Sequence, residues 1–470
     1  SLLVRQNNII DNLKTIVIMY VENTTGKQEK QSLKNNIYFK IGTIVVIALL
    51  LLIPTSMIKI LIHEREAIQR EAIREVSSKW AEEQTISGPF ISIPYYRYVK
   101  EISAKDSTEQ IVQIKDYIHI LPSELKISGN LNPEKRQRGI YEIVVYNSKL
   151  EIDGTFNNLD IKALEIEPEN ILFDKAEFVV GIKDLRGIEK EVNLSWNNDK
   201  ISFNPGVSSN DIVSSGINAL ININPNDSSS YNFNLSLDLK GSQLLYFTPV
   251  GKVTDIDLAS DWANPSFNGA FLPDTREVTT KGFTANWNIL HLNRNYPQIW
   301  TSNRYSISES SFGIDLLLPV DNYQKTYRSI RYAILFITFT FLVFFFIEVF
   351  KKVFIHPIQY ILVGVSLIVF FTLLLSISEH LNYNFSFIIS AIATLALIAG
   401  YVRAILSSTK LALLISGILT VLYAFIFVII QLQDYALLIG SIGIFVILGL
   451  VMYFSRKIDW YSLKLGETKK

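Results

Sequence analysis

The chain has 470 residues and carries 44 Lys and Arg against 44 Asp and Glu, so its formal net charge is zero. A neutral balance makes nucleic acids and other polyanions poor candidate partners. Cysteine is absent, which excludes disulfides, thiolate zinc sites, thiolate-bound iron–sulfur clusters and cysteine nucleophiles. A domain outside the cytosol must then rely on its hydrophobic core, so we expect such a domain to be large.

Residues 1–37 are predicted to be a cytoplasmic tail. Their apolar piece, residues 9–21, is interrupted by polar side chains and is too short to span a membrane, and it lacks the features of a secretory signal. Residues 38–62 form the first predicted spanning helix. Lysines before and at its start, including Lys40, favour a cytoplasmic N-terminus. Pro54 lacks a backbone donor and is predicted to bend this helix.

Residues 63–327 are predicted to be a single extracytoplasmic domain. Residues 63–84 continue the first helix as a stalk, because apolar side chains recur at i+4 beside opposite-charge pairs. Beyond them, apolar and polar residues alternate in segments such as 233–239 and 283–289, with turn residues between the segments. This pattern predicts antiparallel strands with one wet face, in a β-sandwich or an open barrel.

Five apolar runs follow, each close to the roughly 20 residues that cross a bilayer as a helix. The runs are residues 332–350, 358–377, 385–402, 411–430 and 435–454. Lipid offers the backbone no hydrogen-bond partner, so each run is predicted to be a helix. The expected fold is therefore a membrane protein with one N-terminal and five C-terminal spanning helices around a sandwich-like β domain. The five helices occupy residues 328–455, and residues 456–470 form a second cytoplasmic tail.

The turns between the last five helices predict the orientation. Lysine and arginine occur in alternate turns, at Lys351 and Lys352, at Arg403 and Lys410, and after the last run. The positive-inside rule places these turns in the cytoplasm and the β domain in the periplasm. Three cations before the second helix run against this rule locally, but the rule is weak beside a long translocated segment. They are Lys325, Arg328 and Arg331.

Sequence motifs for catalysis are missing. The five histidines are too far apart to suggest a local metal-ligand pair, and no phosphate-binding glycine loop, nucleophile elbow or HExxH helix is present. We therefore predict no catalytic, metal-binding or cofactor-binding residues and no cofactor.

A few ionisable residues in the membrane part are candidate polar positions. Glu348 is either an ion or proton site or a carboxylate that pairs with Lys351 and Lys352, and the second interpretation is favoured. Glu379, His380 and Asp434 could meet at the outer face of the bundle, as a polar site or as contacts for the β domain. His356 precedes a proline at the start of the third helix.

Long runs in both parts of the chain resemble the CreD family of bacterial inner-membrane proteins. The most specific is HPIQYILVGVSLIVFFTLLLSISEH at residues 356–380; others are SGPFISIP at 87–94 and SDWANPSFNGAFLPDTREV at 260–278. The resemblance extends over residues 38–461. It implies a role in cell-envelope integrity, with links to colicin tolerance and to envelope stress responses under a sensor kinase. The resemblance does not identify any catalytic residues.

Three hypotheses for the function follow. In the first, a non-enzymatic inner-membrane protein supports the envelope through its periplasmic β domain, with the lipid bilayer and other envelope proteins, glycan or lipid as candidate partners. In the second, the membrane part is an enzyme or carrier for a lipid-linked envelope substrate. In the third, the β domain senses a small ligand, which a closed apolar pocket between its sheets would favour.

Overall fold

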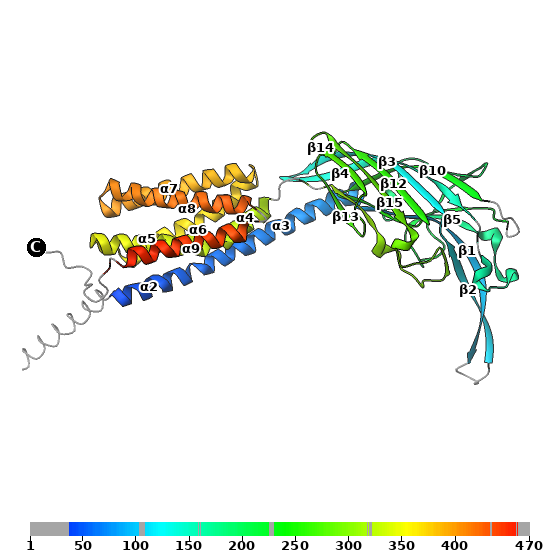
Figure 1. The fold of residues 1–470 in the computed structure, drawn as a ribbon, viewed down its shortest axis with the longest axis horizontal. Coiled ribbons are helices and arrows are strands. Elements are labelled where there is room, and N and C mark those ends of the chain that lie inside the picture. Colours follow the sequence, from blue (N-terminus) through cyan, green and yellow to red (C-terminus); the bar gives the residue numbers. More distant parts are fainter. Residues whose placement is uncertain are drawn as a thin grey trace, which may run out of the picture. The chain divides into compact units, whose positions relative to one another are not determined.

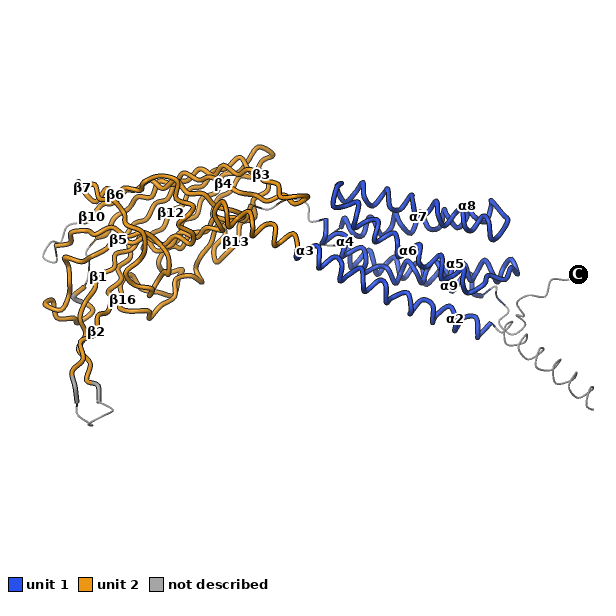
Figure 2. The backbone as a smooth tube through the Cα atoms, turned by 180° about the vertical axis from the view of Figure 1, so that it is seen from behind, with its two compact units in different colours: residues 1–67, 320–470 blue, residues 68–319 orange. Residues whose placement is uncertain are grey.

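The computed structural model describes residues 37–102, 109–157, 159, 161–224, 230–316, 318, 322–432, 435–456 and 458. The chain divides into two compact units (Figure 2). We call Ser1–Ala67 with Val320–Lys470 the membrane unit, and Ile68–Pro319 the β unit. Most of both predicted tails, and Asp434, lie outside the described residues.

Helices build the membrane unit (Figure 1). They are α2 (Ile37–Leu50), α3 (Leu52–Trp80), α4 (Asn322–Arg331), α5 (Ala333–Lys351), α6 (Pro357–Ser378), α7 (Tyr383–Leu406), α8 (Thr409–Gln431) and α9 (Ala436–Ser455). Among the described residues, six stretches are long and apolar enough to cross a membrane: the combined α2–α3 segment and each of α5 to α9. One is N-terminal and five are C-terminal, which confirms the predicted membrane architecture.

The first spanning helix is interrupted at Leu51, between α2 and α3. Pro54 follows three residues later and cannot donate the backbone hydrogen bond that the Leu50 carbonyl would accept in a regular helix. The interruption is local, because the Leu51 N–H still donates to the Ile47 carbonyl at 3.0 Å. Beyond it, α3 continues from the membrane unit into the β unit, where its last turns lie.

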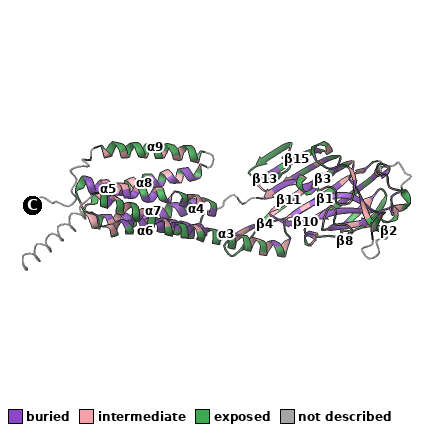
Figure 3. Ribbon diagram, turned by 90° about the horizontal axis from the view of Figure 1, so that it is seen from below, coloured by how far each residue is buried: buried purple, intermediate pink, exposed green. Residues whose placement is uncertain are grey.

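Two features of the helices were not predicted. The short helix α4 is polar on most of its surface and buries Tyr323, Thr326, Ser329 and Ile330. Helix α9 is apolar all round and has no buried residue (Figure 3). Such a helix is stable only in an apolar solvent, which agrees with its place in a bilayer.

Two sheets form the β unit. Within the described residues the first has nine strands: β1 (Gln84–Ile102), β2 (Glu109–Ile120), β5 (Glu177–Ile182), β8 (Asn204–Pro205), β9 (Gly216–Leu220), β11 (Leu244–Thr248), β13 (Pro265–Gly269), β16 (Ile299–Thr301) and β17 (Phe312–Leu316). The second has eight strands: β3 (Glu124–Arg138), β4 (Tyr141–Phe156), β6 (Asn193–Trp196), β7 (Asp199–Ser202), β10 (Tyr231–Ser242), β12 (Val253–Ser260), β14 (Thr275–Thr279) and β15 (Gly282–Leu290). The eight-stranded sheet has the order β14-β15-β12-β3-β4-β10-β6-β7.

One continuous apolar core involves side chains of both sheets. The alternation predicted for residues 233–239 and 283–289 is confirmed, since Phe233, Leu235, Phe283 and Trp287 are buried in this core. Most strand pairs among the described residues are antiparallel, as expected, but two are parallel. Strand β1 pairs in parallel with β11, and β3 pairs in parallel with β12. Each parallel pair joins segments more than a hundred residues apart, so no local turn signal announces it.

Candidate functional site

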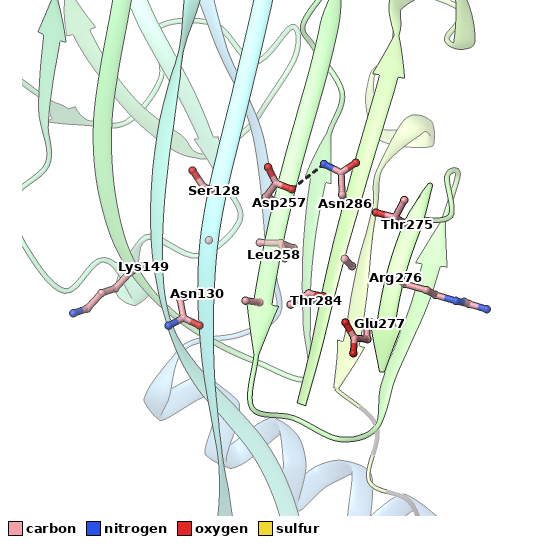
Figure 4. A pocket seen from close by; sticks show the side chains of 13 residues that line it. Ser128, Asn130, Lys149, Asp257, Leu258, Thr275, Arg276, Glu277, Thr284 and Asn286 are labelled. Atoms are coloured by element: carbon pink, nitrogen blue, oxygen red, sulfur yellow. Dashed lines mark hydrogen bonds between the residues drawn. The ribbon is translucent and has the colours of Figure 1, made fainter. Parts of the chain in front are cut away.

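An open groove lies on the face of the eight-stranded sheet that points away from the core (Figure 4). It has a volume of about 690 Å³. Strand register aligns its side chains in two rows across β3, β12, β15 and β14. The rows are Ser128, Asp257, Asn286 and Thr275, then Asn130, Ala259, Thr284 and Glu277. Residues in register across neighbouring strands point to the same face, so both rows face the groove.

The groove offers hydrogen-bonding groups of several kinds. Asn286 donates from Nδ2 to Asp257 at 2.9 Å, as Figure 4 shows, and also to Asp255 at 3.0 Å. These two bonds fix the orientation of its amide. Ala259, in the middle of the second row, has a short side chain and leaves the hollow open. Carboxylate, amide and hydroxyl groups together suit a ligand rich in hydroxyls or amides.

A buried ion pair lies at one end of the membrane unit. Lys40 Nζ of α2 contacts Glu348 Oε1 of α5 at 2.7 Å, and their side chains are 5% and 0% exposed. The Ile355 N–H donates to the same Glu348 oxygen at 3.1 Å, and the Tyr360 hydroxyl of α6 donates to Oε2 at 2.9 Å. Lys40 Nζ also donates to the Ile355 carbonyl and lies 4.2 Å from the Phe354 ring centroid. We call Lys40, Glu348, Ile355 and Tyr360 the Lys40 cluster.

The Lys40 cluster corrects the pairing predicted for Glu348. Lys351 and Lys352 are exposed, whereas Glu348 points into the bundle and meets the lysine of the first helix. Both charges have ionic and hydrogen-bonding partners, which is the condition under which a buried pair is tolerated in an apolar medium. The arrangement is that of a structural tie between α2, α5 and α6. It also places the start of α2 and the α5–α6 turn at the same end of the bundle, as predicted.

Glu379 anchors a second polar cluster, at the other end of α6. Its Oε1 lies 3.6 Å from Arg65 Nε of α3 and accepts a hydrogen bond from the Tyr323 hydroxyl of α4 at 3.1 Å. Asn322 of α4 donates from Nδ2 to the Ser378 carbonyl at 2.7 Å. These contacts attach both helices that lead to the β unit to the end of α6.

The remaining predicted positions do not join either cluster. His356 caps α6, since its Nδ1 accepts from the Ile358 N–H at 3.4 Å. His380 is exposed, and Asp434 lies outside the described residues. Within the described chain no hydrogen bond or ion pair joins two of the predicted residues, so the structure does not assemble them into one site.

A buried histidine in the β unit was not singled out from the sequence. His119 Nε2 lies 3.1 Å from Asp211 Oδ2, and His119 Nδ1 lies 3.3 Å from Ser92 Oγ. The imidazole is 1% exposed, and the rings of Phe90 and Trp300 pack against it. Burial lowers the pKa of His119, and Asp211 partly opposes this shift. Because Ser92 is buried as well, the trio holds the segment carrying Asp211 on the sheet rather than presenting a nucleophile.

The groove and the Lys40 cluster were not predicted from the sequence, for different reasons. Groove residues such as Asn130 and Asn286 have the pattern of any solvated strand face, and only strand order brings them together. Lys40 stands 308 residues before Glu348. One signal was available, because a lone lysine and a lone glutamate inside apolar helices are costly unless they pair with each other.

Solved structures resemble this chain only weakly. An M1 zinc metallopeptidase from Deinococcus radiodurans matches with a TM-score of 0.18 and 9% identity, over 36% of this chain and 38% of that one. Leukotriene A4 hydrolase from Saccharomyces cerevisiae matches with a TM-score of 0.18 and 13% identity, over 36% of this chain and 26% of that one. The chain thus spans less than half of these proteins. At such scores the likeness carries no argument about fold or function.

Sequence relatives are far more informative. Inner membrane protein CreD from Escherichia coli (strain K12) is 32% identical over 444 residues, which cover 93% of this chain and 96% of that protein. The profile of the family described as inner membrane protein CreD matches residues 36–461. This span includes the Lys40 cluster, the groove and all six candidate membrane spans. The chain therefore belongs to the CreD family of inner membrane proteins.

Proposed function

We propose that this protein supports the integrity of the cell envelope without catalysing a reaction, and that its β unit contacts another envelope component outside the cytosol. The observation that carries the proposal is the groove on the eight-stranded sheet. It is open, most of its lining residues are polar, and the other face of its sheet packs on a large apolar core. The resemblance to the CreD family supports a role in the envelope and in its stress response.

The polar residues of the membrane unit also support a non-enzymatic role. Glu348, the acidic candidate within the apolar helices, is occupied on both oxygens by Lys40, Ile355 and Tyr360. A carboxylate so fully bonded is poorly placed to exchange protons with a substrate. The second hypothesis, an enzyme or carrier for a lipid-linked substrate, therefore has less support. The described side chains of both sheets form one continuous apolar core, which favours surface contact over a ligand enclosed between the sheets.

The test is complementation of a deletion strain under envelope stress, with variants in the groove. Asn286→Lys places a bulky charge in the groove, and we expect it to lose complementation at normal protein levels. The matched control is Asn234→Lys, an exposed asparagine on β10 of the same sheet and the same face, outside the groove. It should complement fully.

Crosslinking in cells identifies the contacted component. A photoreactive residue at Thr284, in the groove, should capture an envelope protein, glycan or lipid that the same residue at Ser236 does not capture. Full rescue by Asn286→Lys together with identical products from both positions would contradict the proposal. Loss of rescue on alanine substitution of His380 or Asp434, at normal expression, would instead favour the enzyme or carrier.

A further inference from the structure

Two cations, Lys59 of α3 and Arg331 at the end of α4, lie near an aromatic contact between these helices. His63 of α3 and Tyr327 of α4 pack with ring centroids 5.0 Å apart. Lys59 lies one helical turn from His63, and Arg331 lies one turn from Tyr327, with its guanidinium 5.1 Å from the Tyr327 ring centroid. The two chain segments run in opposite directions, so these steps bring Lys59 and Arg331 to the same level.

Two of the neighbouring acids are already engaged. Glu66 pairs with His63 at 3.2 Å, and Glu379 pairs with Arg65 at 3.6 Å. Helix α4 contains no carboxylate at all. Within the described residues neither Lys59 nor Arg331 has an ion-pair partner. Two like charges at one level repel each other, and an anion between them would convert this repulsion into attraction.

An apolar crevice lies further into the membrane unit, and on α2 its lining residue nearest to Lys59 is Leu49. The crevice lies between α2 and α5, has a volume of about 430 Å³, and has Thr338 as its only polar lining residue among those described. Ala48 and Leu49 of α2 line it together with Phe341 and Leu342 of α5. On α5 the crevice starts at Ile334, three residues after Arg331. The two cations beyond one end of the crevice and the apolar side chains along its length match the two parts of an amphiphile.

We propose that this crevice binds an anionic phospholipid, with the phosphate between Lys59 and Arg331 and an acyl chain between α2 and α5. A phosphate offers acceptor oxygens to both cations, and Arg binds it through a planar fork of donors. The apolar walls contribute through burial of the chain. This site is separate from the groove of the β unit and does not depend on the function proposed for that groove.

The experiment uses the full chain purified in neutral detergent. It is titrated with phosphatidylglycerol or with phosphatidylcholine, and the bound lipid is counted by native mass spectrometry. Each Lys or Arg near an anionic group contributes roughly fivefold to affinity. We therefore expect phosphatidylglycerol to bind about tenfold or more tightly than phosphatidylcholine, and Lys59→Gln/Arg331→Gln to abolish this preference.

Two controls locate the site. Arg403→Gln/Lys410→Gln removes two exposed cations, one near the end of α7 and one at the start of α8, and should leave the lipid preference unchanged. Glycerol 3-phosphate, the headgroup without chains, should compete poorly, because it cannot occupy the crevice. Equal binding of the two lipids, an unchanged preference in the Lys59→Gln/Arg331→Gln variant, or effective competition by glycerol 3-phosphate would each overturn the proposal.

Discussion

Lys40 is the residue whose loss should most damage the membrane unit. In Lys40→Met the Glu348 carboxylate would stay buried with only neutral donors, and breaking a buried pair in this way costs about 3–5 kcal/mol. Equilibrium unfolding of the full chain in mixed micelles measures this cost. Lys351→Met, at an exposed lysine of α5, is the control and should change stability by less than about 0.5 kcal/mol.

The double variant Lys40→Met/Glu348→Leu should recover most of the stability lost in Lys40→Met. Equal stability of Lys40→Met and the control variant would contradict the prediction.

His119 makes the stability of the β unit depend on pH. Burial lowers the pKa of His119 in the folded state, so at mildly acidic pH the unfolded chain binds more protons than the folded one. The free energy of unfolding must then decrease as the pH falls below about 6.5, the ordinary value for histidine. Urea unfolding followed by tryptophan fluorescence should show this decrease, and His119→Gln should reduce it. An identical pH dependence in both proteins would show that other groups cause it.

At the scale of elements, close pairing of β3 with β4 depends on Gly154. A Cβ at this position would lie 2.1 Å from the Glu124 carbonyl oxygen, and this backbone atom cannot move without opening the strand pair. Gly154→Ala should therefore lower stability by about 1–3 kcal/mol, measured by thermal unfolding. Gly400→Ala in α7 is the contrasting variant, since nothing lies within 4 Å of a Cβ there. It should be neutral or slightly stabilising, because alanine favours helix.

Helices and strands could be predicted where the surrounding solvent determines the spacing of their apolar residues. Contacts between segments far apart in the sequence could not be predicted. Lipid requires long apolar helices, so the predicted run 411–430 is close to the observed α8. A sheet with one wet face requires alternation, so β10 and β15 were predicted. Helix α4 was missed because it is short and polar. The groove and the Lys40 cluster depend on the β3–β12 pairing and on the Lys40–Glu348 contact, both made between segments more than a hundred residues apart.

For the whole molecule, the proposed orientation places the β unit in the periplasm and both termini in the cytoplasm. A reporter that is active only outside the cytosol, inserted in the turn between Trp196 and Asp199, should be active. The same reporter inserted between Lys351 and Lys352, or fused after Arg456, should be silent. The opposite result at these three positions would reverse the orientation without changing the fold.

The continuity of α3 has a mechanical consequence. This helix runs from Leu52 in the membrane unit to Trp80 in the β unit without a loop between them. A pull on the β unit would reach the bilayer along the hydrogen-bonded backbone of α3, and it would be resisted at the far end of α2 by the contact of Lys40 with Glu348. A load on the β unit would thereby change the tilt of a single spanning helix.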